Sequence, residues 1–513
     1  MYPAAVRIPL RPSALFLAAL ACGAGSCALD RTLAPPGEAL EALEATLRAE
    51  TGSGSIPSVA FAIVKDGRVL RENAFGWADK EARIASSVHT PYPLASATKP
   101  IVATAVMILQ ERGLIDLDAP APASPGAAPP EYRVRQLLNH TSGLPTYASI
   151  HWRDQDRPAR SLEQTLGKYG FAAQPPGTIF EYSNLGYGLL GRIVERQSGS
   201  SLAEFLEAEV FGPLGMHDSS LVDSDSDFDL APAGAAVKYA ADGKRLVGTC
   251  NDTPGAGSAY ASAHDLALFG AFHLSDDPVA TAPILRAESK RGMRRFVEPG
   301  ASFSYYDGAR YGLGWYFRTT AAGEPVVWHE GGMPGASAIL VLLPKRGVAV
   351  AVVINATDAN AKAQTFANSL IQAVEPGFPA LAFDATAGLD RYTDQAEFLG
   401  RWEGTIAIDG PELPWALDFD PGGTIRATVP GRTEGDRLPP VATFGAFVKG
   451  PLLVATLAAT LPSADVDQTS DGYVLLRLVR RGDQLSGAAI AYAAPSRLEH
   501  LYPFAARLRR VPE

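Results

Sequence analysis

The sequence predicts an α+β protein in which helices flank an antiparallel sheet with an α-helical insertion, followed by a C-terminal all-β, barrel-like domain. Two observations carry this prediction. Strand-like patterns stand at both ends of the first 378 residues and helix-like patterns lie between them. Beyond residue 396 only short strand-like runs separated by turns remain, which is typical of a small barrel or sandwich.

The first predicted elements are a helix and a hairpin. Leucines at helical spacing predict an amphipathic helix over residues 37–50. The apolar run 58–64 predicts a buried strand. Asp66 and Gly67 are turn residues, so residues 69–77 are expected to return as the second strand of a hairpin.

The later elements follow from the same signals. Periodicity and stop residues predict helices over residues 96–112, 184–197 and 360–373, and strands over residues 326–329, 336–343 and 348–355. In the C-terminal domain a Gly-Asp turn separates predicted strands 473–480 and 485–493. The predicted boundaries are residues 1–27 for an export signal, 28–378 for the first domain, 379–396 for a linker and 397–513 for the C-terminal domain.

Composition excludes several classes of protein. Hydrophobic residues make up 47% of the chain and charged residues 19%, which indicates a globular and not a disordered protein. The formal net charge is −10 and no basic patch is evident, so a nucleic-acid partner is not expected. Three cysteines in 513 residues exclude a disulfide network.

The N-terminus resembles an export signal. Arg7 and Arg11 precede an apolar run over residues 13–24, which is too short to span a bilayer. Cys22 and Cys27 lie at its end after small residues. Two alternatives remain open: lipidation at Cys27 or Cys22 with membrane anchoring, and plain secretion with both cysteines removed. Either alternative predicts a periplasmic or secreted protein.

The most informative motif is Ser96-Ala97-Thr98-Lys99. Residues three apart share one face of a helix, so the Lys99 amine can reach the Ser96 hydroxyl. A serine hydroxyl becomes an effective nucleophile when a neighbouring base removes its proton. Pro100 is tolerated only in a first helical turn, which places Ser96 near a helix start among unpaired N–H groups.

A second candidate element is Tyr182-Ser183-Asn184, at the start of a predicted helix. A phenol acts as a base when a nearby cation lowers its pKa, and Lys99 is the candidate cation. The Asn184 amide is a candidate contact to the Lys99 surroundings or to a substrate carbonyl. The alternative interpretation is a turn with a helix cap.

A third candidate element is His329-Glu330-Gly331-Gly332, at the end of a predicted strand. Glycines here let a substrate lie close to the strand backbone. The Gly332 N–H is expected to pair with the Ser96 N–H as an oxyanion hole. The alternative interpretation is a hairpin turn with a chance histidine.

Other chemistries find little support in the sequence. It contains no Gly-x-Ser-x-Gly elbow, no phosphate-binding loop and no His-x-x-x-His pair. We therefore expect neither a metal site nor an organic cofactor.

The three elements together resemble the serine β-lactamase and penicillin-binding-protein superfamily, and within it the class C β-lactamase, esterase and D-peptidase branch. The resemblance covers residues 38–373. Further matching stretches are residues 109–118, 134–145, 213–216, 254–257 and 262–267. One of them contains His140, for which loop packing is expected.

The resemblance implies roles for individual residues. Ser96 corresponds to the acylated nucleophile, Lys99 to its proton acceptor, Tyr182 to a second acid/base and Asn184 to an amide-side contact. Residues 329–331 occupy the place of the family's Lys-Thr-Gly strand, with His329 and Gly331 as expected substrate-binding residues. His-x-Gly variants resemble peptidases and esterases more than dedicated β-lactamases.

The sequence thus predicts an exported serine hydrolase that acts through an acyl-enzyme on a small ester, a peptide or a cell-wall-derived substrate. The alternative is a catalytically silent member that binds peptidoglycan or a partner. Because residues of a strand alternate, His329 and Glu330 are expected to point to opposite faces, so that at most one of them faces the substrate. A neutral His329 is a weak carboxylate anchor and a nearby Glu330 repels carboxylates, so esters and amino-acid amides are expected to react faster than β-lactams. Activity on anionic substrates is expected to rise as the pH falls through the titration of His329.

Overall fold

A computed structural model describes residues 36–121, 131–153, 160–222, 231–276, 284–295, 309–383, 390–430, 440–468, 472–493 and 500–512. The expected export segment, with Cys22 and Cys27, lies outside the described residues. Within these ranges, no helix combines the length and apolar character needed to cross a membrane.

The N-terminal domain is built on an antiparallel sheet of eight strands, which confirms the predicted α+β class. In spatial order the strands are β3 (Ile84–Ala85), β2 (Arg68–Asp79), β1 (Ser58–Lys65), β13 (Val348–Ile354), β12 (Ala336–Leu343), β11 (Pro325–Met333), β10 (Tyr316–Thr319) and β9 (Arg310–Tyr311). The first and last parts of the domain meet at the centre, where β1 pairs with β13. Asp66 and Gly67 form the β1–β2 turn with positive φ angles of 49° and 76°.

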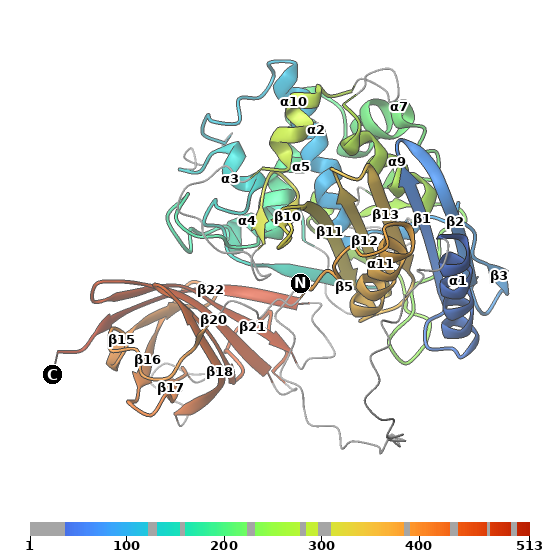
Figure 1. Ribbon diagram of the computed structural model, residues 1–513. Helices are drawn as coiled ribbons and strands as arrows, with labels where there is room; N and C mark the ends of the chain where they lie inside the picture. The colour runs from blue at the N-terminus through green and yellow to red at the C-terminus, as the bar shows by residue number, and fades with distance from the viewer. Residues whose placement is uncertain are drawn as a thin grey trace, which may run out of the picture.

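Helices cover both faces of this sheet (Figure 1). On one face lie α1 (Pro36–Gly52) and α11 (Asn360–Val374), which pack on each other. Helix α1 also packs on β1 and β2, and α11 on β12 and β13. On the other face lie α2 (Lys99–Glu111) and α9 (Ala263–Leu274). Strand residues alternate between the two cores: Val350 and Val352 pack toward α11, and Ala349 and Ala351 toward α9.

The predicted helical insertion lies between β2 and β9. Its elements are β4 (Tyr92–Pro93), η1 (Ala95–Thr98), α2, α3 (Val134–Leu138), β5 (Ala148–Trp152), α4 (Leu162–Tyr169), α5 (Asn184–Ser198), α6 (Leu202–Leu206), η2 (Glu207–Phe211), α7 (Gly212–Leu214), β6 (Ser220–Leu221), β7 (Thr249–Asn251), α8 (Pro254–Gly257), β8 (Ala259–Ala261), α9 and α10 (Ala287–Met293). The short strands β4, β8 and β6 form a small sheet of their own.

Local chemistry explains where α5 begins and ends. The Ser183 hydroxyl accepts a hydrogen bond from the Gly186 N–H and caps the first turn. Gly199 ends the helix in the left-handed conformation, with φ of 77°. The cap therefore fixes Tyr182 and Asn184 on either side of the helix start.

The C-terminal domain is an eight-stranded antiparallel barrel closed by β15 and β22, as the alternating pattern predicted. Its strands are β15 (Gly400–Ala407), β16 (Glu412–Phe419), β17 (Ile425–Thr428), β18 (Val441–Lys449), β19 (Leu452–Ala458), β20 (Gly472–Arg481), β21 (Gln484–Ala493) and β22 (His500–Arg510), and β14 (Asp390–Arg391) adds to β18. Trp402, Ile406 and Leu417 are among the side chains that fill the interior.

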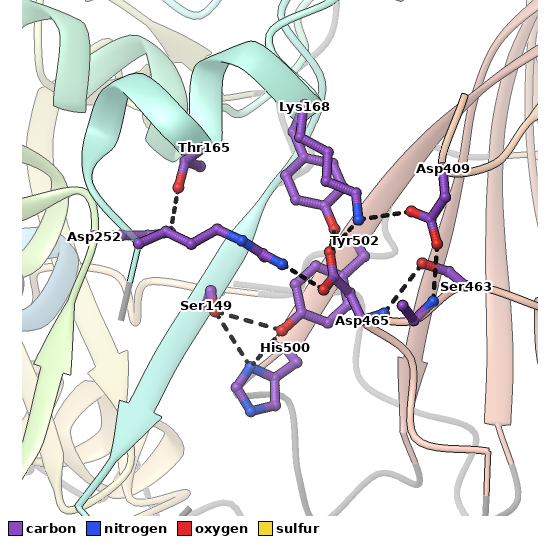
Figure 2. Close-up of polar contacts among 12 residues, drawn as sticks. Ser149, Thr165, Lys168, Asp252, Asp409, Ser463, Asp465, His500 and Tyr502 are labelled. Atoms are coloured by element: carbon purple, nitrogen blue, oxygen red, sulfur yellow. Dashed lines mark hydrogen bonds and ion pairs between the residues drawn. The ribbon is translucent and has the colours of Figure 1, made fainter. Parts of the chain in front are cut away.

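The sequence did not predict the close junction between the two domains. Strand β22 continues beyond the barrel and pairs with β5 (Figure 1). Strand β5 in turn pairs with β7. Ion pairs reinforce the junction: Lys168 of α4 lies 2.6 Å from both Asp409 and Asp465 of the barrel (Figure 2). Tyr169 of α4 stacks on Tyr502 of β22 with ring centres 5.6 Å apart.

Candidate active site

Ser96 lies at the start of the long helix of the insertion, in a tighter turn than we expected. The predicted helix over residues 96–112 begins as the 3₁₀ turn η1, and α2 itself begins at Lys99 with Pro100 in its first turn. Ala95 has a positive φ of 47°, so the chain turns sharply just before the serine. Ser96 is half-buried while its neighbours in η1 are buried, which leaves its hydroxyl on the accessible side.

Lys99 is fully buried and faces neutral partners. Its Nζ lies 3.1 Å from Ser96 Oγ, 2.8 Å from Asn184 Oδ1 and 2.9 Å from the Ala256 carbonyl oxygen. Among the described residues no carboxylate pairs with it. Burial therefore lowers the pKa of Lys99 well below its ordinary value. A neutral amine in this place donates to Asn184 and Ala256 and keeps its lone pair for the Ser96 proton.

Tyr182 and Asn184 complete this cluster from the start of α5. The Lys99 Nζ lies 4.7 Å from the centre of the Tyr182 ring. The Asn184 amide is oriented by two contacts, because its oxygen accepts from Lys99 and its nitrogen donates to the Tyr147 carbonyl at 2.7 Å. Among the residues that the structure describes, the second amide hydrogen of half-buried Asn184 has no partner. The structure thus brings together four predicted site residues from two helices.

The glycines of β11 lie directly against η1. A Cβ added to Gly331 would stand 1.9 Å from the Leu94 carbonyl oxygen and 2.9 Å from the Ser96 nitrogen, so only glycine permits this approach. The Asn360 amide holds the Gly331 carbonyl at 3.1 Å. Gly332 follows on the same strand and is exposed.

His329 differs from its expected role as a titrating anchor for substrate carboxylates. It is only 1% exposed, and both ring nitrogens have protein partners. Nδ1 lies 2.8 Å from the Glu330 carbonyl oxygen, to which it donates, and Nε2 accepts from the Tyr311 hydroxyl at 2.8 Å. Burial, with the nearby Lys99, lowers the pKa of His329 well below its ordinary value. The imidazole is therefore a neutral support for β11.

Glu330 points away from Ser96, because successive residues of a strand face opposite sides. Its carboxylate lies against α11 and bonds to the Gln364 amide. The other carboxylate oxygen is buried without a partner among the described residues. Burial raises the pKa of Glu330 to about 7. The expectation that Glu330 repels substrate carboxylates is wrong for this geometry, because the sheet stands between the two.

Two residues that the sequence analysis did not place in the site border Tyr182 and His329. Tyr311 holds His329, and its ring packs on His140 with centres 4.7 Å apart. His140 also packs on Tyr182 at 4.3 Å and accepts a hydrogen bond from the Ser183 N–H at 3.1 Å. His140 has a positive φ of 60°, which sequence alone does not reveal. Burial lowers the pKa of His140 well below its ordinary value.

A metal centre finds no support in the described part of the chain, where no group of three or more His, Cys, Asp or Glu side chains is placed to hold an ion. Cys250 is buried on β7.

Most of the N-terminal domain matches a known protein family. Residues 40–373 match the family described as Beta-lactamase. Penicillin-binding protein 4* of Bacillus subtilis (strain 168) is 26% identical over 295 residues, which are 54% of this chain and 63% of that protein. The chain thus spans about six-tenths of the length of the curated relatives it matches.

Solved structures share the fold. The crystal structure of SurE superposes with a TM-score of 0.63 at 24% identity. The superposition covers 93% of this chain, so it includes the barrel, and 99% of the SurE chain. The D-amino acid amidase from Ochrobactrum anthropi SV3, solved with L-phenylalanine, superposes with a TM-score of 0.54 at 24% identity over 66% of this chain and 99% of its own.

Proposed function

The chain belongs to the β-lactamase family of serine hydrolases, and from this premise we propose that it cleaves ester or amide bonds through an acyl-enzyme on Ser96. The proposal rests on one contact: the buried Lys99 amine lies 3.1 Å from the half-buried Ser96 hydroxyl. Among the described residues the amine has no acidic partner. A neutral amine removes the hydroxyl proton as the oxygen attacks.

In the acylation step Ser96 Oγ forms a bond to the substrate carbonyl carbon while its proton passes to Lys99 Nζ. The N–H groups of Ser96 and Gly332 stabilise the negative oxygen of the tetrahedral intermediate. The intermediate then expels the alcohol or amine, which receives a proton from Lys99 or through Tyr182. The close approach of Gly331 to η1 supports this role, because it brings the strand that carries Gly332 against the turn that carries Ser96.

In the deacylation step water attacks the acyl-enzyme. Lys99 and Tyr182 accept its proton and return one to Ser96 as the acid is released. The remaining Asn184 amide hydrogen is suited to hold the carbonyl of the substrate's amide side. No step requires a metal or an organic cofactor.

For the substrate we propose a short acyl ester or an amino-acid amide in preference to a penicillin or cephalosporin. His329 is buried and neutral, so it supplies no positive charge for the carboxylate of a β-lactam. The likeness to a D-amino acid amidase and to a penicillin-binding protein is in line with a peptide-like or cell-wall-derived amide.

Labelling with a fluorophosphonate probe, followed by mass spectrometry of the tryptic peptides, tests the proposal. We expect one probe per chain on Ser96 and no labelling of the Ser96→Ala variant. Absence of labelling in the wild-type protein, with retained binding to peptidoglycan fragments, would establish the silent binding member instead.

Export is a further part of the proposal, supported by Arg7, Arg11 and the apolar run 13–24. Mass analysis of the mature N-terminus from the producing cell tests it. A lipid on Cys22 or Cys27 identifies an anchored protein, a cleaved chain identifies secretion, and an intact Met1 contradicts export.

A further inference from the structure

A buried arginine of the barrel reaches the segment that carries Tyr182. Arg477 stands in β20 among leucines and is 7% exposed. Its Nε donates to Glu181 Oε2 at 2.5 Å, and a terminal nitrogen donates to the Phe180 carbonyl at 3.3 Å. Two consecutive residues immediately before Tyr182 are thus held by one side chain of the other domain.

Glu181 connects Arg477 to the backbone around Tyr182. It is 4% exposed, and its second carboxylate oxygen accepts from the Thr146 hydroxyl at 2.6 Å. The same hydroxyl lies 2.8 Å from the Tyr182 carbonyl oxygen. The Glu181 N–H donates to the His140 carbonyl at 2.8 Å. The backbone on both sides of Tyr182 is therefore tied to residues 140–146 and, through Glu181, to the barrel.

This segment sets the position of a ring that packs closely in the site. The Tyr182 ring lies 4.3 Å from the His140 ring and 4.7 Å from Lys99 Nζ, measured between ring centres and from ring centre to nitrogen. Proton transfer depends steeply on such geometry, and a displacement of about 1 Å costs roughly 10²-fold in rate.

We propose that Arg477 is a positioning residue for the reaction, which acts through Glu181 to hold Tyr182 against Lys99. The barrel then contributes to the geometry of the active site, through the position of Tyr182, and is not a separate appendage. This inference rests on the proposed function, because it assigns Tyr182 a part in proton transfer.

Four variants of the full chain, assayed with a neutral p-nitrophenyl ester, test the proposal. In Arg477→Met we expect kcat to fall roughly 10- to 100-fold with KM changed by less than about threefold, and the alkaline limb of the pH–rate profile to shift, because Tyr182 is displaced. Arg477→Lys keeps the positive charge but loses the contact to the Phe180 carbonyl, so we expect its kcat to lie between those of Arg477→Met and wild type.

The matched control is Lys168→Met, which removes two ion pairs across the same junction without touching residues 180–184 (Figure 2). We expect its kcat to stay within about twofold of wild type with an unchanged pH profile. An equal loss in Lys168→Met and Arg477→Met would show that barrel attachment alone matters, and would overturn the proposal.

Arg477→Met leaves the buried Glu181 carboxylate unpaired, which can prevent folding. The double variant Arg477→Met/Glu181→Gln removes this charge as well. We expect the double variant to fold, to remain at least about tenfold slower than wild type, and to exchange the backbone amide hydrogens of positions 181 and 183 faster than wild type. Wild-type kcat in the double variant overturns the inference while the proposed function stands. A wild-type protein that the fluorophosphonate does not label overturns both.

Discussion

The hydroxyl of Tyr311 lies 2.8 Å from Nε2 of His329, and this contact decides what the histidine can do. Because Nδ1 already donates to the Glu330 carbonyl, the hydroxyl donates to Nε2 and the ring stays neutral. Protonation would place two donors face to face in a buried site. The strand position for which the sequence resemblance implied the place of the family's Lys-Thr-Gly lysine is therefore uncharged.

The first prediction concerns pH and substrate charge. Since the pKa of His329 is lowered, protonation of this ring does not assist anionic substrates near neutral pH. We expect the ratio of kcat/KM for a hemisuccinate ester to that for a neutral ester to change by less than about twofold between about pH 7.5 and 5.5. A rise of about tenfold centred near pH 6.5 would instead show that His329 titrates in the site.

The second prediction concerns Glu330, whose pKa burial raises from 4.5 to about 7. The folded state binds the proton more tightly than the unfolded state, so stability falls as the pH rises through this pKa. The shift corresponds to roughly 3 kcal/mol for the fully ionised group at pH 8. We expect Glu330→Gln to raise the unfolding free energy at pH 8 and to change it little below pH 4.5.

Urea unfolding of the wild type and of Glu330→Gln at several pH values measures this difference. Because the carboxylate faces α11 and not Ser96, kcat/KM of the variant is expected to stay within about twofold of wild type on cationic and anionic substrates alike. A selective gain on anionic substrates would show that Glu330 acts on the substrate after all.

The third prediction concerns the close approach of β11 to η1. Gly331→Ala places a Cβ 1.9 Å from the Leu94 carbonyl oxygen, so the strand must withdraw from Ser96. Loss of one oxyanion donor costs about 10²–10³-fold in kcat, and we expect a loss of this size. Gly37→Ala is the control, because nothing lies within 4 Å of its added Cβ. Steady-state kinetics on one neutral ester compares the two.

Much of this architecture follows from local sequence signals. Leucine spacing predicts α1, the Asp66-Gly67 turn predicts the first hairpin, and the Ser96–Lys99 spacing predicts the contact that the structure contains. These features depend on residues that are near each other in the chain. Local sequence patterns were therefore sufficient to predict the fold class and the contact between Ser96 and Lys99.

Local sequence patterns did not predict the contacts between segments that are distant in the chain. Tyr311 of β9 meets His329 of β11 across the intervening strand β10, and Arg477 meets Glu181, which lies 296 positions away in the chain. A lone arginine in the apolar run of β20 was a visible signal of a buried partner, but the sequence does not say which carboxylate it meets. The face to which Glu330 points was likewise decided by the sheet and not by its neighbours.

The fourth prediction concerns the protonation of Lys99. The neutral amine is the reactive form, so activity is present above its lowered pKa and is lost as the pH falls through it. We expect kcat/KM on a neutral ester to show no rise near pH 10.5, where an ordinary lysine loses its proton. Lys99→Arg, which stays charged at every accessible pH, is expected to be inactive and unlabelled by fluorophosphonate. A rate step near pH 10.5 would contradict a neutral Lys99.

The last prediction concerns Lys99 and Tyr182 as one proton-transfer unit. The two side chains lie in contact, with Nζ 4.7 Å from the ring centre, and both are buried. Groups that handle the same proton are non-additive, since removal of either already abolishes the transfer. We expect Lys99→Met and Tyr182→Phe each to lower kcat/KM by several orders of magnitude and the double variant to be little worse than the worse single one. Steady-state kinetics of all four proteins on one neutral ester, with folding checked by circular dichroism, measures the cycle. Losses that multiply fully in the double variant would assign the two residues independent roles and contradict the shared proton.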